Sequence, residues 1–249
     1  EKHFFPQDKA LKKQYITAGA VCGAMLAISV NFQQFGISAY PAGAAAEARS
    51  GFITALYVVF VPLLSFFFGK KVSPVIWASV AVAVVGFYML CLSGGISGIY
   101  TADILVFICA FCFAGQIISV DKFVGLTGGV KLSVMQFTVA GALSAVFAVI
   151  FERPTMENII AAAPQILYLG IVSSGVGYTL QIVGQKYAEP SVASLSMSLE
   201  SVFAALAGWV LLNQKFSGRE MLGCAIMFAA IVLAQLPDLI AAAKKKKGK

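Results

Sequence analysis

Long apolar runs, separated by short polar turns, make up most of the chain. Each run is close to the roughly 20 residues that an α-helix needs to cross the bilayer core, and none shows the strict alternation of a membrane-barrel strand. The turns carry glycine, proline and charged residues, as in "GKKVSP", "ERPTMEN" and "NQKFSG". The pattern predicts an all-α integral membrane protein with eight transmembrane helices, at residues 15–36, 51–69, 74–93, 102–120, 132–151, 162–184, 191–212 and 219–236.

The composition supports a lipid environment. Hydrophobic residues fill 59% of the 249 positions and charged residues 12%, and the mean hydropathy is +0.88. A soluble domain carries about 25% charged residues, so this chain has too little charge to cover a water-facing surface. The lipid bilayer is therefore its first expected partner.

The basic residues indicate the orientation in the membrane. Eight spans place both chain ends on one side, and fourteen of the 18 basic residues fall on that side. The remaining four are Arg49, Arg153, Lys215 and Arg219. Because cytoplasmic loops are enriched in Lys and Arg, we expect a multi-pass protein of the plasma membrane with both termini in the cytoplasm.

The net charge of +7 does not indicate nucleic acid as a partner. Five of the basic residues lie in the last six positions, "KKKKGK", so residues 237–249 are predicted to form a basic cytoplasmic tail. Most of the others border apolar runs, which suits a membrane surface.

Two stretches of the chain resemble each other. "SFFFGKKVSPVIWASVAVAVVGFYML" ends at Leu90 and "GWVLLNQKFSGREMLGCAIMFAAIVL" ends at Leu233, and aligning Ser73 with Ser217 gives an offset of 144 residues. In the predicted topology the first turn is cytoplasmic and the second external. Copies that face opposite ways are typical of inverted-repeat transporters. The repeats are assigned to residues 1–98, with three helices, and 99–236, with five.

Two parts of the sequence resemble the EamA family of the drug/metabolite transporter superfamily. "QQFGISAYPAG" with "RSGFITALYVVFVPLL" is similar to the family's third and fourth helices. "QKYAEPSVASLSMSLESVFAALAGWVLLNQKFSGREMLGCAIMFAAIVLA" is similar to its last two. The resemblance implies ten helices in two inverted five-helix repeats. We therefore expect the eight helices here to lack the first two of that pattern. A genuine eight-helix protein is the alternative.

The resemblance also implies a function. Members of the family are secondary transporters that move small metabolites by alternating access, often as exporters. The expected substrate is an amino-acid-like or amphipathic small molecule, and efflux is the expected direction. The alternative is a non-transporting structural or partner protein of the membrane. Homodimerisation, substrate identity and proton coupling stay open.

No sequence pattern predicts catalysis, a cofactor or a metal site. A membrane-embedded enzyme needs paired carboxylates, histidines or a metal cluster at membrane depth. This chain has one acid at mid-span, and its one histidine, His3, lies in a polar flank. Cys109 and Cys112 form a C-x-x-C pair, but no second pair or nearby histidine completes a metal site.

That one acid at mid-span is Glu200, in "SLSMSLESVFAALAGWVLL". An ionisable group at membrane depth is costly and should face the bundle interior or water. It is therefore a candidate for binding a substrate or a proton. A structural role, in which it bonds to neighbouring backbone or hydroxyl groups and holds helices together, is the alternative.

Uncharged polar residues at membrane depth are further candidates for a central pocket. The whole set is Asn31, Gln33, Gln34, Tyr57, Gln116, Gln136, Tyr178, Gln181 and Ser198. Of these, Gln33, Gln116, Tyr178 and Gln181 are predicted to bind substrate, since a pocket between two repeats draws on several helices. Hydrogen bonding between helices is the alternative role.

Three residues inside spans are candidate hinges. Pro62 lies within one predicted span, where proline removes a backbone hydrogen bond and kinks a helix. Gly175 and Gly177 interrupt another span. Kinks in a packed bundle without any gating role are the alternative.

Overall fold

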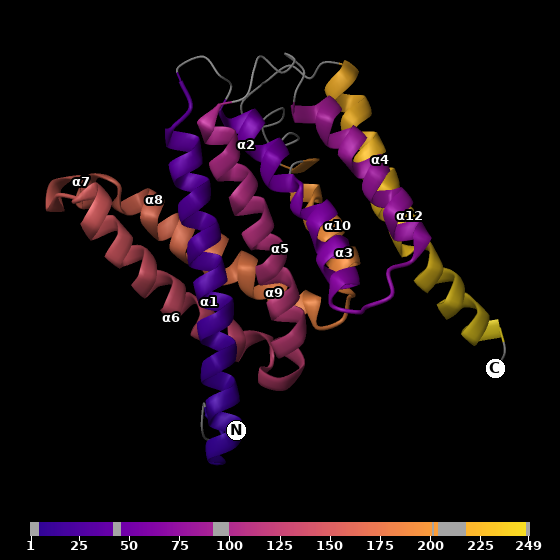
Figure 1. The fold of residues 1–249 in the computed structure, drawn as a ribbon, viewed down its shortest axis with the longest axis horizontal. Helices are drawn as coiled ribbons and strands as arrows, with labels where there is room; N and C mark the ends of the chain where they lie inside the picture. Colours follow the sequence, from indigo (N-terminus) through magenta and orange to yellow (C-terminus); the bar gives the residue numbers. More distant parts are fainter. Residues whose placement is uncertain (1–4, 42–45, 92–99, 201, 204–217, 248–249) are drawn as a thin grey trace. The chain divides into compact units, whose positions relative to one another are not determined.

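The structure, a computed structural model, is helical throughout the part of the chain that it describes (Figure 1). It describes residues 5–41, 46–91, 100–200, 202–203 and 218–247. The first helices are α1 (Lys9–Ser38), α2 (Ala46–Ala55), α3 (Tyr57–Phe67), α4 (Pro74–Cys91), α5 (Thr101–Thr127) and α6 (Gly129–Phe147). They are followed by η1 (Ala148–Glu152), α7 (Met156–Ala161), α8 (Ala163–Tyr168), η2 (Leu169–Tyr178), α9 (Thr179–Gln185), α10 (Pro190–Met197) and α12 (Gly218–Lys247).

The helices confirm the predicted class of all-helical membrane protein. Five helical stretches of the described chain are long and apolar enough to span a bilayer: Lys9–Ser38, Ser50–Phe67, Thr101–Thr127, Gly129–Glu152 and Ala163–Gln185. Two shorter apolar helices, Pro74–Met89 and Met221–Ala234, coincide with two more predicted spans. In the predicted span 191–212, residues 201 and 204–212 lie outside the described residues.

The chain divides into two compact units that do not follow the order of the sequence. Unit 1 comprises residues 1–31 and 115–189, and unit 2 comprises residues 32–114 and 190–249. Helices α1 and α5 each contribute residues to both units. Each unit therefore takes helices from both halves of the sequence.

In unit 1, α1 packs closely against α6. A Cβ atom added at Gly19 would lie 2.5 Å from Cβ of Met135, and one added at Gly23 would lie 2.7 Å from the carbonyl oxygen of Gln136. Small residues of this kind let helix backbones approach each other in a membrane. The core around this contact consists of Ala18, Cys22, Val120, Val124, Leu132, Met135 and Ile182.

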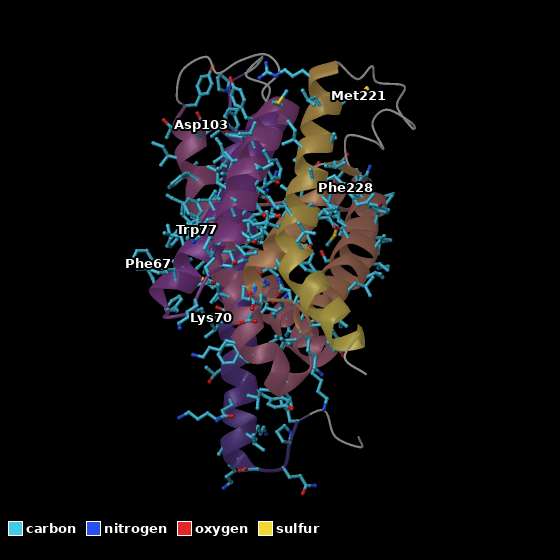
Figure 2. All side chains as sticks on the ribbon, turned by 90° about the vertical axis from the view of Figure 1, so that its right-hand side faces the viewer. Phe67, Lys70, Trp77, Asp103, Met221 and Phe228 are labelled. Atoms are coloured by element: carbon cyan, nitrogen blue, oxygen red, sulfur yellow. The ribbon has the colours of Figure 1, made fainter. Side chains whose placement is uncertain are left out.

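In unit 2, α4 and α12 run antiparallel and side by side (Figure 1). Gly86, near the end of α4, touches Gly223 and Met227 near the start of α12 so closely that an added Cβ would lie 2.7 Å from Cγ of Met227. Figure 2 shows Lys70 and Asp103 near opposite ends of unit 2, with Met221 at the Asp103 end. The turn between α3 and α4 is therefore at one end of this unit, and the starts of α5 and α12 are at the other.

Candidate functional site: a cavity in unit 1

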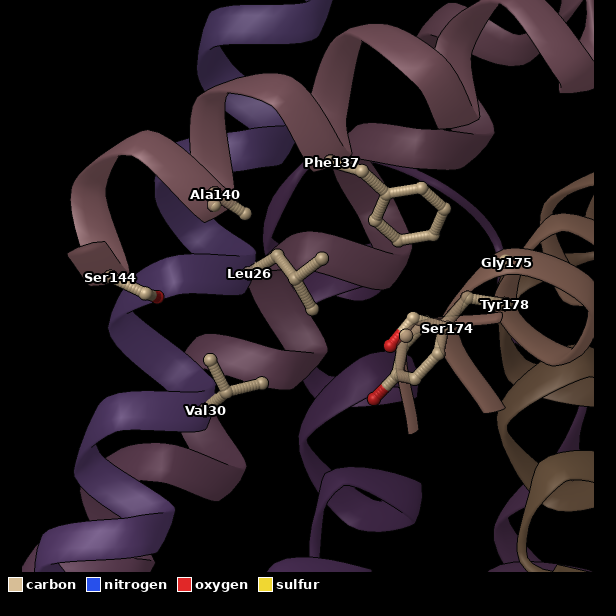
Figure 3. Close-up of a pocket in the computed structure, with 10 residues that line it drawn as sticks. Leu26, Val30, Phe137, Ala140, Ser144, Ser174, Gly175 and Tyr178 are labelled. Carbon is tan, nitrogen blue, oxygen red and sulfur yellow. The ribbon is translucent and has the colours of Figure 1, made fainter. Parts of the chain in front are cut away.

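A cavity of about 350 Å³, partly open to the outside of the unit, lies between α1, α6 and η2 of unit 1 (Figure 3). Helix α1 contributes Leu26 and Val30, and α6 contributes Phe137, Ala140, Gly141 and Ser144. All three walls belong to helical stretches that are candidate membrane spans. The volume is in the range of roughly 300–1,000 Å³ that small-molecule sites occupy.

The third wall is a π-helical segment. Segment η2 contributes Gly170, Ser174, Gly175 and Tyr178 to the cavity, and its sequence is "LGIVSSGVGY". Three glycines within ten residues weaken an α-helix, since each costs about 1 kcal/mol relative to alanine. Wider π-helical turns are rare and often occur at functional sites. The local sequence thus favours an irregular helix where the cavity lies.

Aromatic rings and hydroxyl groups give the cavity its chemistry. The rings of Phe137 and Tyr178 meet edge to face, with centroids 6.2 Å apart and planes at 87°. Figure 3 shows the hydroxyls of Ser174 and Tyr178 pointing from the η2 side toward Leu26 and Val30. Ser144 carries the hydroxyl of the α6 wall, and its Oγ accepts a hydrogen bond of 3.0 Å from Nδ2 of Asn31.

Of the five predicted substrate residues, Tyr178 lines this cavity. Gln116 also belongs to unit 1, where it is buried and its Nε2 donates to Oε1 of Gln136 at 3.2 Å. Gln181 is half-buried in α9 and is not among the described residues of the cavity wall. The structure therefore brings one of these three side chains to the site.

The other two predicted substrate residues, Gln33 and Glu200, belong to unit 2. Nε2 of Gln33, on α1, donates to Oγ1 of Thr54 on α2 at 3.3 Å. Glu200 follows α10, and its side chain is exposed. Gln33 thus makes the interhelical contact that was the alternative to substrate binding, and Glu200 is not among the residues of the cavity wall.

The candidate hinges lie at different kinds of sites. Gly175 and Gly177 fall inside η2, where the helix changes its hydrogen-bonding register. Pro62 is buried in the middle of α3, and the break between α2 and α3 falls at Leu56, six residues earlier. The helix is therefore irregular around the two glycines, and the chain continues as helix through the proline.

Several cavity residues carried no signal in the sequence. Leu26, Val30 and Phe137 are apolar residues within predicted spans, and neither Ser144 nor Ser174 stands out from the small residues around it. Asn31 belonged to the larger set of deep polar residues, and it is the residue that holds Ser144.

Within the described part of the chain, no group of three His, Cys, Asp or Glu side chains is placed to hold a metal ion.

Comparison with known proteins identifies the family. The model of the EamA-like transporter family matches residues 100–236, which is more than half of the chain. An uncharacterized transporter of Archaeoglobus fulgidus is 31% identical over 189 residues, covering 76% of this chain and 60% of that protein. The chain thus spans about 60% of the length of this relative. Protein PecM of Dickeya dadantii is 32% identical over 81 residues, covering 32% of this chain and 27% of PecM.

A solved crystal structure of another protein shares the fold. It superposes with a TM-score of 0.72 at 18% sequence identity, covering 95% of this chain and 78% of the other. The fold, the apolar spans and the sequence relationships agree with one another. The chain belongs to the EamA-like transporter family, a family of multi-pass membrane transporters and not of enzymes.

Proposed function

We propose that this chain is a secondary transporter that moves a small amino-acid-like or amphipathic metabolite out of the cell by alternating access. The observation that carries the proposal is a cavity of small-molecule size, walled by three apolar spans, in a member of a transporter family. Residues 1–98 and 99–236 are the two repeats, and residues 237–249 are the tail.

Packing in unit 2 supports the inverted repeat. The offset of 144 residues pairs positions of α4 with positions of α12, and most of the paired positions share their burial. Buried pairs are Ser79 with Gly223, Ala83 with Met227, Gly86 with Ala230 and Phe87 with Ile231. Because the two helices also run antiparallel, their contact resembles that of two copies related by a two-fold axis in the membrane plane. The turn Lys215–Ser217 itself lies outside the described residues.

A flux assay tests the proposal. The purified 249-residue chain is reconstituted in liposomes, and counterflow of labelled L-phenylalanine and labelled nicotinamide is measured. The first probe is amino-acid-like and zwitterionic, and the second is an uncharged amphipathic ring compound. We expect saturable, protein-dependent flux of at least one of them. Absence of saturable flux for both probes contradicts the proposal and favours the non-transporting alternative.

Two glycines provide a matched pair of variants for this assay. A Cβ at Gly141 or at Gly125 would meet no atom within 4 Å, so both positions accept a larger side chain. Gly141 lines the cavity, whereas Gly125 on α5 is not among its described residues. We expect Gly141→Leu to fill the cavity and reduce flux at least tenfold, and Gly125→Leu to retain it. Cells that express the unchanged protein should also accumulate less of the probe than cells that express Gly141→Leu.

A further inference from the structure

The wall of the unit 1 cavity carries a specific combination of groups. Two aromatic rings, two serine hydroxyls and a tyrosine hydroxyl face it, together with aliphatic and glycine surface. None of its described residues is charged. From this composition, and resting on the proposed transport function, we propose that the cavity selects a small uncharged solute bearing a planar ring and a hydrogen-bond acceptor. Asn31 is the positioning residue that presents the Ser144 hydroxyl to that acceptor.

Electrostatics favours neutral over charged solutes at this wall. A carboxylate or ammonium group that leaves water needs an opposite charge or several hydrogen bonds to offset its lost hydration. The described wall supplies hydroxyls and no counter-ion. A neutral solute loses far less hydration on entry, so it should bind in preference to a charged solute of the same shape.

The aromatic wall favours a planar ring. Phe137 from α6 and Tyr178 from η2 already meet edge to face at 87°. A third ring placed against them gains the same kind of offset or edge contact, and it also buries apolar area. Leu26 and Val30 close the opposite side, toward which the Tyr178 hydroxyl points (Figure 3).

Asn31 determines how the hydroxyl group of Ser144 can donate a hydrogen bond. Its Nδ2 group donates to the Ala27 carbonyl at 2.7 Å and to Oγ of Ser144 at 3.0 Å, so both amide hydrogens are engaged. Because Ser144 accepts this bond, its own hydrogen is left to donate. Ser119 and Ser133 behave differently, since their hydroxyls donate to the carbonyl one turn earlier, at 2.8 and 2.9 Å. In the described part of the chain Ser144 makes no such bond, and its hydrogen is available to a solute.

Binding of three matched probes tests the proposal. Nicotinamide, nicotinate and picolylamine share one ring and size, and at neutral pH they are uncharged, anionic and cationic. Dissociation constants are measured by ligand-observed NMR titration of the 249-residue chain in nanodiscs, with empty nanodiscs as the blank. We expect nicotinamide to bind at least tenfold tighter than either charged probe. Equal affinity for the three probes, or a preference for a charged one, overturns the proposal.

Variants separate the role of Asn31 from a structural one. Ser144→Ala should weaken nicotinamide binding about fivefold, as expected for one lost hydrogen bond, while Ser119→Ala should leave it unchanged. Asn31→Leu should weaken binding similarly, but it should add nothing in the Ser144→Ala background, because it acts through that hydroxyl. Additive losses, or full affinity in Ser144→Ala, overturn the assignment.

Saturable phenylalanine flux with no preference for neutral probes would refute this inference alone, whereas selective binding without flux would refute only the transport function.

Discussion

At the scale of single residues, Glu200 poses the sharpest question. An acid at membrane depth costs a few kcal/mol and by default indicates a functional site, and its exposed side chain can reach a solute or a proton. Glutamine keeps the shape and the hydrogen bonding of glutamate but removes its titration. We therefore predict that Glu200→Gln keeps the melting temperature of the natural chain but loses the pH dependence of its flux in liposomes.

Another exposed glutamate provides the control for this prediction. Glu189 lies in the turn between α9 and α10 and is also exposed. Glu189→Gln should retain both stability and pH dependence. A fall in the melting temperature of Glu200→Ala that Glu200→Gln does not show would support the structural alternative, and unchanged pH dependence in Glu200→Gln would rule out proton coupling through this group.

Residue types explain how much of the site the sequence predicted. Tyr178 was found because a polar aromatic at membrane depth is unusual, and Asn31 was noticed for the same reason. Leu26, Val30 and Phe137 were not found, because apolar side chains look alike whether they face a cavity, a neighbouring helix or lipid. Gln33 and Gln116 were predicted to bind substrate, and in the structure they hydrogen-bond to Thr54 and Gln136 of other helices.

At the scale of helices, η2 is the element whose geometry bears on transport. A Cβ at Gly175 would lie 3.1 Å from the Gly170 carbonyl oxygen, five residues earlier, whereas one at Gly177 would lie at an ordinary 3.6 Å from that of Val172. We predict that Gly175→Ala lowers the maximum flux several-fold with little change in KM, because the methyl group crowds the π-helical turn. Gly177→Ala should transport normally and be slightly more stable, as alanine favours helix.

The two alanine variants differ by only two positions, so they control for helix propensity and for general disturbance of η2. Flux kinetics and melting temperatures of both, in the same liposomes and detergent, are the measurements. Equal maximum flux in the two variants would show that η2 does not bend during transport. A change confined to KM in Gly175→Ala would instead assign this glycine to the cavity wall alone.

Hydropathy located the helices better than it located their ends and interruptions. Helix α1 begins at Lys9, six residues before the predicted span, and α5 continues to Thr127. Apolar runs mark the bilayer core, whereas Lys and Gln are good helix formers in water and let a helix continue beyond it. The break at Leu56 changes only the hydrogen-bonding register, so an apolar run shows no sign of it, whereas the irregular turns of η2 coincide with three glycines.

At the scale of the whole molecule, repeat and topology depend on each other. Compact units that each draw on both halves of the sequence do not reveal the repeat. The matched burial of α4 and α12 does support it, since symmetry-related helices should bury the same face. If the repeats are inverted, the turn after α3 and the turn before α12 must lie on opposite sides of the membrane. The orientation of one turn therefore fixes the orientation of the whole chain.

The charge distribution predicts the orientation of the turn between α3 and α4 in the membrane. The turn between α3 and α4 contains Lys70 and Lys71, and cytoplasmic loops are the ones enriched in lysine.

Ser73, next to that turn, and Glu152, at the end of η1, are both exposed, and replacing them removes no basic residue. In a background without the five natural cysteines, we expect a membrane-impermeant maleimide to label Glu152→Cys in intact cells. Ser73→Cys should react only after permeabilisation. The opposite pattern would place both termini outside and reverse the orientation, and labelling of both sites in intact cells would contradict the predicted number of spans between them.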